Sequence, residues 1–180
     1  MSYSGRVARI NSCLLIRALV VAALFVFSLS AIGSEGNFVS REQDRIRGMS
    51  ELEEIHFTLV SYVEIKREFG DLLDHNDGLQ WPLKVFAWSN RILHKVSTDR
   101  NPLRECFIMR SENVAKMIRG EVTYGEFRKN GEDTAKCIGD AQKTVSQKYG
   151  TSPFERLSMT ERDQQSLRRI IGLAKALASE

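Results

Sequence analysis

The placement of two cysteines about a predicted turn constrains the fold of this 180-residue chain more than any other feature of its sequence. Cys106 and Cys137 lie at nearly equal distances on either side of residues 119–127. In an antiparallel helical hairpin, residues equidistant from the connecting turn lie side by side. A rise of about 1.5 Å per residue puts both cysteines about 22 Å from the turn. The spacing therefore predicts a disulfide between two antiparallel helices.

The turn itself is predicted from three local signals in the segment RGEVTYGEF. Gly120 suits the left-handed conformation that commonly follows the end of a helix. Thr123 and Glu126 form the S/T-x-x-E pattern of a capping box, which begins a new helix. Val122 and Phe127 stand at the positions of a hydrophobic staple, which fixes the direction in which the chain enters that helix. All three signals indicate one boundary between two helices.

The sequence leaves two other interpretations of Cys106 and Cys137 open. They could be two separately buried thiols, or they could bind a metal ion. The metal site is the weaker interpretation, because neither cysteine belongs to a CxxC pair or a Cys/His cluster. A disulfide closing this loop would stabilise the fold by about 3 to 4 kcal/mol. We therefore expect a Cys106–Cys137 disulfide.

The N-terminal 33 residues have the pattern of a signal peptide. Residues 1–17 are basic and contain no acidic residue, and residues 18–29 (ALVVAALFVFSL) form an uncharged apolar run. Small residues at 31–33 suit cleavage by a signal peptidase. The apolar run is shorter than the roughly 20 residues that span a bilayer, which favours cleavage over the alternative, a retained membrane anchor. The sequence predicts a signal peptide at 1–33 and a periplasmic or secreted domain at 34–180.

The charge of that domain is balanced. Arg6, Arg9 and Arg17 are the only charged residues before position 34, and they belong to the 26 Lys and Arg of the whole chain. The remaining 23 basic residues face 23 acidic ones. A formally neutral domain has no net attraction to polyanions, so we expect no nucleic-acid partner. Association with a membrane is expected only if the leader is retained.

The rest of the chain has the periodicity of helices. Apolar residues recur at intervals of three and four, and no segment alternates with the period of two that a strand requires. Capping patterns, Asn-Asp-Gly at 76–78 and Gly150 set the boundaries. The expected helices cover residues 40–48, 50–74, 82–97, 101–119, 123–149 and 160–180, with a short helical turn after Ser152. The sequence predicts an all-α fold, a single compact bundle of five or six helices with a disulfide-clipped hairpin.

The sequence contains no complete motif for catalysis, for a cofactor or for a metal. Beyond the leader, the histidines are His56, His75 and His94, and nothing in the spacing brings them together. Glu53 and His56 form one E-x-x-H, but a di-iron bundle needs two copies and two further carboxylates. His56 also lies beside an apolar helix face and is expected to be a packed histidine. We expect no catalytic, cofactor-binding or metal-binding residues, and no cofactor.

Three further features bear on binding at the surface. Trp81 and Trp88 are interpreted as core residues. The loop around residues 71–78 has too few ligands at the right spacing for Ca²⁺ and is interpreted as a turn. Small basic patches near both ends of the domain are interpreted as solvated faces, because acidic residues lie close to them in the sequence. The basic residues concerned are Arg41, Arg45, Arg47, Arg168 and Arg169.

The segment from Gly120 to Phe127, GEVTYGEF, resembles a G-x-[I/V]-T-Y-G-E-F pattern found in small exported all-helical proteins of Gram-negative bacteria whose function is unassigned. The resemblance covers eight residues and implies an exported helical domain. It carries no active-site residue.

These observations favour a protein that acts by binding another envelope or secreted protein, for example as an inhibitor, immunity protein or envelope adaptor. The alternative is a hydrolase of the cell wall that uses two carboxylates in a cleft between helices. We expect a binding protein rather than an enzyme.

Overall fold

The computed structural model describes residues 35–70, 80–150 and 159–180 of the chain. Residues 38–180 form a compact unit, the second unit of the chain. The described residues contain only helices and the connections between them, so the all-α prediction is confirmed. Residues 38–47 belong to a helix that is already formed at residue 35, so the predicted start at Ser40 is wrong. The other helices of the second unit are α2 (Glu51–Ile65), α3 (Gln80–Val96), α4 (Arg104–Ile118), α5 (Tyr124–Tyr149) and α6 (Glu161–Ala178), with a π-helical turn η1 (Lys66–Gly70) after α2.

The predicted helix starts are confirmed at α2, α5 and α6. In each, the side-chain hydroxyl of the residue before the helix accepts a hydrogen bond from the backbone amide of the third helical residue, whose carboxylate accepts one from the backbone amide of that preceding residue. These reciprocal pairs satisfy backbone donors that a helix leaves open at its first turn. They are Ser50 with Glu53, Thr123 with Glu126, and Thr160 with Asp163. The helix ends at Gly120 and Gly150 are also as expected, with φ of +69° and +66°.

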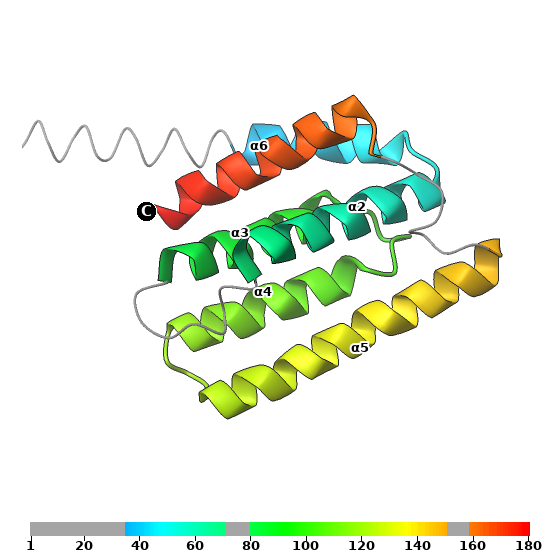
Figure 1. Cartoon of the computed structure of the whole chain (residues 1–180). Coiled ribbons are helices and arrows are strands. Elements are labelled where there is room, and N and C mark those ends of the chain that lie inside the picture. Colours follow the sequence, from blue (N-terminus) through cyan, green and yellow to red (C-terminus); the bar gives the residue numbers. More distant parts are fainter. Residues whose placement is uncertain (1–34, 71–79, 151–158) are drawn as a thin grey trace, which may run out of the picture. The chain divides into compact units, whose positions relative to one another are not determined.

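The core lies where α2, α3 and α4 meet. Phe57, Phe86 and Phe107 are its largest fully buried side chains, one from each of these helices. Figure 1 shows α3 running beside α2 and α4 running beside α3, with α6 along one edge of the bundle and α5 along the other. A fully buried stripe on three central helices explains why the spacing of apolar residues was enough to predict the fold class.

The helix from residue 50 departs from its prediction near its end. The expected α-helix to residue 74 gives way at Lys66 to η1, and residues 71–79 lie outside the described part, as does the turn expected at 76–78. At Gly70 a β-carbon would lie 2.9 Å from Cγ of Lys66 and 3.3 Å from Cε2 of Phe86. Any larger side chain at this position would therefore require Lys66 or Phe86 to shift. On α2 Val63 is 40% exposed, whereas the neighbouring Tyr62 is buried.

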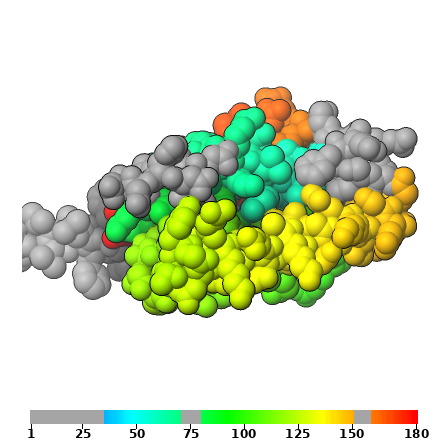
Figure 2. All heavy atoms as spheres, turned by 60° about the horizontal axis from the view of Figure 1, so that its bottom comes forward, coloured from blue at the N-terminus to red at the C-terminus, as the bar shows by residue number. Residues whose placement is uncertain are grey.

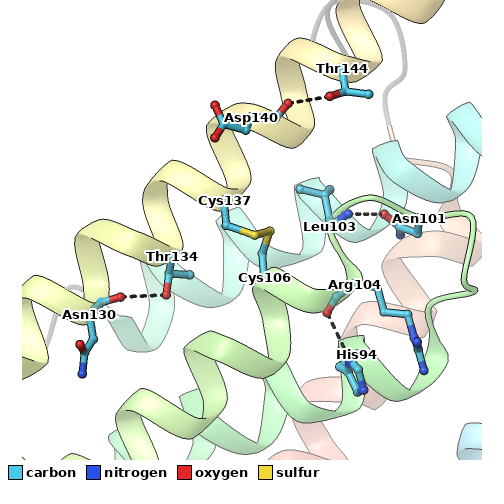
Figure 3. The surroundings of a disulfide bond; sticks show 10 residues. All are labelled: His94, Asn101, Leu103, Arg104, Cys106, Asn130, Thr134, Cys137, Asp140 and Thr144. Carbon is cyan, nitrogen blue, oxygen red and sulfur yellow. Dashed lines mark hydrogen bonds between the residues drawn. A yellow bond between two sulfur atoms is a disulfide. The ribbon is translucent and has the colours of Figure 1, made fainter.

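The disulfide between Cys106 and Cys137 is present, which confirms the predicted pairing of α4 with α5. The two Cα atoms are 5.7 Å apart, and Figure 3 shows the bridge joining the facing sides of the two helices. Cys106 is completely buried and Cys137 is half-buried. Asn113 of α4 adds a second link, because its side-chain amide donates to the backbone oxygen of Phe127 at 3.0 Å.

Helix α5 packs chiefly against α4 through one narrow stripe of buried residues, and its remaining surface is largely polar. The stripe comprises Phe127, Thr134, Ile138, Ala141 and Val145. Figure 2 shows the atoms of α5, from yellow-green to orange, extending across the face turned toward the viewer. Because the apolar contact is narrow, we expect the disulfide to contribute strongly to the attachment of α5 to the bundle.

The prediction that Trp81 lies in the core is wrong. Trp81 was expected there with Trp88, but its side chain is 42% exposed and its indole nitrogen donates to the hydroxyl of Ser179 at 3.2 Å. The residue lies in the first turn of α3, at the end of the bundle where the chain also finishes. The amphipathic indole keeps its polar edge toward α6 there. Trp88 does pack against the core, as expected.

Candidate functional site

Two adjoining hollows lie where residues 38–47 meet the N-terminal ends of α2 and α6. The larger, about 390 Å³, we call the capped pocket, and the smaller, about 270 Å³, the arginine groove. They share Arg45 and Arg162. The capped pocket is lined by Arg45, Gly48, Met49, Glu53, His56, Thr160, Arg162 and Asp163. The arginine groove is lined by Arg41, Glu42, Arg45, Arg162, Gln165, Ser166 and Arg169.

Arg45 forms the wall between the two hollows. Its guanidinium donates to Glu42 at 2.7 Å, to Asp163 at 2.6 Å and to the hydroxyl of Ser166 at 3.2 Å. The Ser166 hydroxyl in turn donates to Glu42 at 2.6 Å. The side chains of Arg45 and Glu42 are only 8% and 7% exposed. The prediction that Arg45 belongs to a solvated face is therefore wrong, because α6 covers this arginine and supplies two of its acceptors.

Asp163 has two roles at the start of α6. One carboxylate oxygen accepts from the Thr160 hydroxyl at 2.7 Å, and the other accepts from Arg45. Burial alone would raise the pKa of Asp163, but the hydrogen bonds from Thr160 and Arg45 outweigh it and lower the pKa. The carboxyl group is therefore ionised at neutral pH.

Glu53 occupies the corresponding place at the start of α2. Its carboxylate accepts from the backbone amide and the hydroxyl of Ser50, both at 2.8 Å. The bond from the Ser50 amide is the main cause that lowers the pKa of Glu53, and the hydroxyl adds to it. The capped pocket thus contains two carboxylates, as the hydrolase alternative requires, but both are held in the ionised form. A general acid for glycoside hydrolysis needs a raised pKa.

The arginine groove brings together residues that are far apart in the chain. Arg41 comes from residues 38–47, and Arg162 and Arg169 come from α6. All three side chains are exposed, and none makes an ion pair or hydrogen bond with the described part of the chain. The sequence presented Arg41 and Arg169 as separate basic patches, and the structure places both on one groove. Arg162 was not singled out, although its spacing of seven residues from Arg169 places both on the same face of a helix.

The remaining basic residues of the two patches lie outside the groove. Arg47 pairs with Asp44 at 3.5 Å, with both side chains largely exposed, which is the solvated arrangement expected for it. Arg168 is exposed on α6 and does not line the groove. Of two adjacent arginines, only one therefore faces the groove.

The histidines do not form a site. His56 is buried, as expected for a packed residue, at the inner wall of the capped pocket. His94 lies on α3 with its Nδ1 3.1 Å from the backbone oxygen of Arg104, and His75 lies outside the described residues. Within the described ranges, no three His, Cys, Asp or Glu side chains come together as metal ligands would. None of the helices described combines the length and hydropathy needed to cross a lipid bilayer.

Comparison of the chain with protein-family models, with curated protein sequences and with solved structures finds no match.

Proposed function

We propose that this protein is exported to the periplasm or secreted and acts there by binding another envelope or secreted protein, as an inhibitor, immunity protein or adaptor would. The signal-peptide pattern of residues 1–33 and a disulfide within residues 34–180 support export, because disulfides persist in oxidising compartments. The resemblance of residues 120–127 to exported helical proteins agrees with this assignment.

The observation that carries the binding role is the arginine groove. Three arginines with no anionic partner in the described part of the chain line one hollow at the surface. Beside it, the two carboxylates of the capped pocket are fixed as helix caps. Carboxylates that are fixed in position and ionised can bind a surface of complementary charge. They cannot donate the proton that hydrolysis requires.

Hydrolysis by two carboxylates remains the second candidate, because Glu53 and Asp163 do line one pocket. The lowered pKa of each carboxyl group argues against it. Incubation of the exported protein with purified peptidoglycan tests this candidate directly. Turnover that is lost in both Glu53→Gln and Asp163→Asn, and kept in Glu112→Gln on the exposed face of α4, would favour hydrolysis over binding.

The binding role is tested by affinity capture. The protein, exported through its own leader and kept under oxidising conditions, is used to capture partners from envelope and secreted extracts. We expect one protein in stoichiometric amount, which then forms a complex of defined mass when the two purified proteins are mixed. Repeated capture without a stoichiometric partner would contradict the proposal.

The compartment is tested by intact-mass measurement of the exported protein with and without reductant. A chain that begins near Ser34, and whose mass rises by about two daltons on reduction, is expected. A full-length chain with free thiols would contradict both cleavage of the leader and oxidation of Cys106 and Cys137.

A further inference from the structure

We propose that the arginine groove binds an acidic segment of the partner protein, with side-chain carboxylates held by Arg41, Arg162 and Arg169. This inference rests on the proposed function and names the chemistry by which the partner is recognised.

The first argument is the local balance of charge. Arg45 and Glu42 neutralise each other inside the wall of the groove, and Asp163 takes a second bond from Arg45. No acidic side chain is left for Arg41, Arg162 and Arg169 among the residues that line the groove. Three like charges around one hollow repel one another, and an anion placed between them relieves that repulsion.

The second argument is the shape of the cationic surface. Arg162 and Arg169 are seven residues apart on α6, which corresponds to about 10 Å along the helix axis. A peptide in the extended polyproline II conformation covers that distance in about three residues, and its residues i and i+3 point to the same side. Arg41 faces them from the neighbouring helix. Guanidinium groups match carboxylates through two parallel hydrogen bonds, so separated arginines suit two carboxylates along one extended chain.

The third argument distinguishes a peptide from a phosphate or a nucleic acid. Protein sites for phosphate commonly use the free backbone donors at a helix N-terminus. At the start of α6, Thr160 and Asp163 already occupy this position. Residues 34–180 also carry equal numbers of basic and acidic residues, so the domain as a whole has no net positive charge. A long polyanion would gain little from the rest of the surface.

The test uses a short synthetic peptide with two glutamates separated by two glycines, and a second peptide with glutamine in place of each glutamate. Binding to the exported protein is followed by amide chemical shifts, which detect weak complexes. We expect the glutamate peptide alone to shift residues of the segment 38–45 and of the first three turns of α6. Arg162→Gln and Arg169→Gln should each weaken binding about tenfold, as expected for loss of a charge-assisted bond.

The matched control is Arg168→Gln, which removes the same charge from the next residue of α6 and should leave the affinity unchanged. All three arginines are exposed, and an unchanged unfolding temperature confirms that the variants remain folded. Equal weakening by Arg168→Gln, equal binding of the glutamine peptide, or no shift at saturating glutamate peptide would overturn the inference. Tighter binding of inorganic phosphate or of a single-stranded DNA oligonucleotide at the same residues would also overturn it.

Failure of this inference is separable from failure of the proposed function. A captured partner that binds the Arg162→Gln/Arg169→Gln variant as tightly as the unchanged protein supports a binding function and overturns the role of the groove. Peptide binding that follows the expected pattern in a protein that captures no partner supports the groove and contradicts the proposed function.

Discussion

The carboxylate of Glu54 holds both the backbone amide and the hydroxyl of Thr98, each at 2.7 Å. Glu54 lies on α2 and is completely buried, whereas Thr98 lies in the connection between α3 and α4. Arg100 in the same connection donates to Glu54 at 3.1 Å. A buried carboxylate is tolerated only when its oxygens are bonded in this way. The bond network therefore fixes the α3–α4 connection, and with it the start of the α4–α5 hairpin, to α2.

We expect Glu54→Ala to lower the free energy of unfolding by about 3 kcal/mol, because it leaves the donors of Thr98 without their acceptor. Glu54→Gln should cost less, about 1 to 2 kcal/mol, since it keeps one acceptor and the shape of the side chain. Urea unfolding of the two variants measures both effects. Glu112→Gln, an exposed glutamate of α4, is the control and should change stability by less than about 0.5 kcal/mol. Equal stability of Glu54→Ala and the unchanged protein would show that this network does not support the fold.

The disulfide supports a second prediction. Reduction, or the double substitution Cys106→Ser/Cys137→Ser, should lower the free energy of unfolding by about 3 to 4 kcal/mol for a separation of 31 residues. The loss should fall mainly on α5, because its buried stripe is narrow and faces α4. Hydrogen exchange should therefore accelerate in α5 before it does in α2 or α3.

Uniform acceleration of exchange across all helices on reduction would contradict this account of α5. So would a reduced protein as stable as the oxidised one. Reduction changes no side chain apart from the two cysteines, so a comparison of the two forms of one sample is its own control.

A third prediction concerns Arg45. Arg45→Met should lower the free energy of unfolding by about 3 to 5 kcal/mol, because it leaves the buried carboxylate of Glu42 without its cation. Adding Glu42→Gln to Arg45→Met should recover part of the loss, since the uncompensated charge is then removed. A double-mutant cycle by urea unfolding measures the coupling. Additive effects of the two substitutions would show that the pair does not act as a unit.

The fold class, the hairpin, its disulfide and three capping boxes were predictable because each depends on residues close together in sequence or on a simple symmetry about a turn. A capping box needs only Ser50 and Glu53, or Thr160 and Asp163, three residues apart. The π-helical turn η1 was not predictable. It brings Gly70 close to Phe86, which belongs to another helix, and such a contact cannot be read from neighbouring residues in the sequence.

The arginine groove was not predictable for a similar reason. Neighbouring acids in the sequence made Arg41, Arg45 and Arg169 look compensated. In the structure Glu42 and Asp163 both form ion pairs with Arg45. Neither of these two carboxylates pairs with Arg41 or Arg169. Counting the charges that are close in the sequence cannot show which arginine forms the ion pairs, because the pairing depends on which faces of two helices meet.

A fourth prediction concerns acid pH. The pKa values of Glu53 and Glu126 are lowered, first by the backbone amides of Ser50 and Thr123 and then by the hydroxyls of the same residues. A carboxyl group with a lower pKa in the folded state stabilises the fold fully above its ordinary value of 4.5. That contribution is lost as the pH falls from this value through the folded-state pKa. Stability should therefore decline as the pH drops below 4.5.

Urea unfolding at a series of pH values from about 6 to about 3 measures this decline. Glu126→Gln should lower stability at about pH 6 and make its dependence on pH shallower. Glu132→Gln removes a carboxylate from the exposed surface of α5 and serves as the charge-matched control. A pH dependence of Glu126→Gln as steep as that of the unchanged protein would show that its capping box does not contribute.

The last prediction separates backbone conformation from packing at two glycines. Gly120 has φ of +69° and nothing within 4 Å of where a β-carbon would lie, so Gly120→Ala should cost about 1 to 2 kcal/mol through backbone strain alone. Gly172, inside α6, is equally open but has no positive φ. Gly172→Ala should therefore raise stability by about 0.5 to 1 kcal/mol, because alanine favours a helix interior over glycine. Urea unfolding of the two variants should give effects of opposite sign. Effects of the same sign would mean that the turn after α4 does not require the left-handed conformation on which the hairpin was predicted.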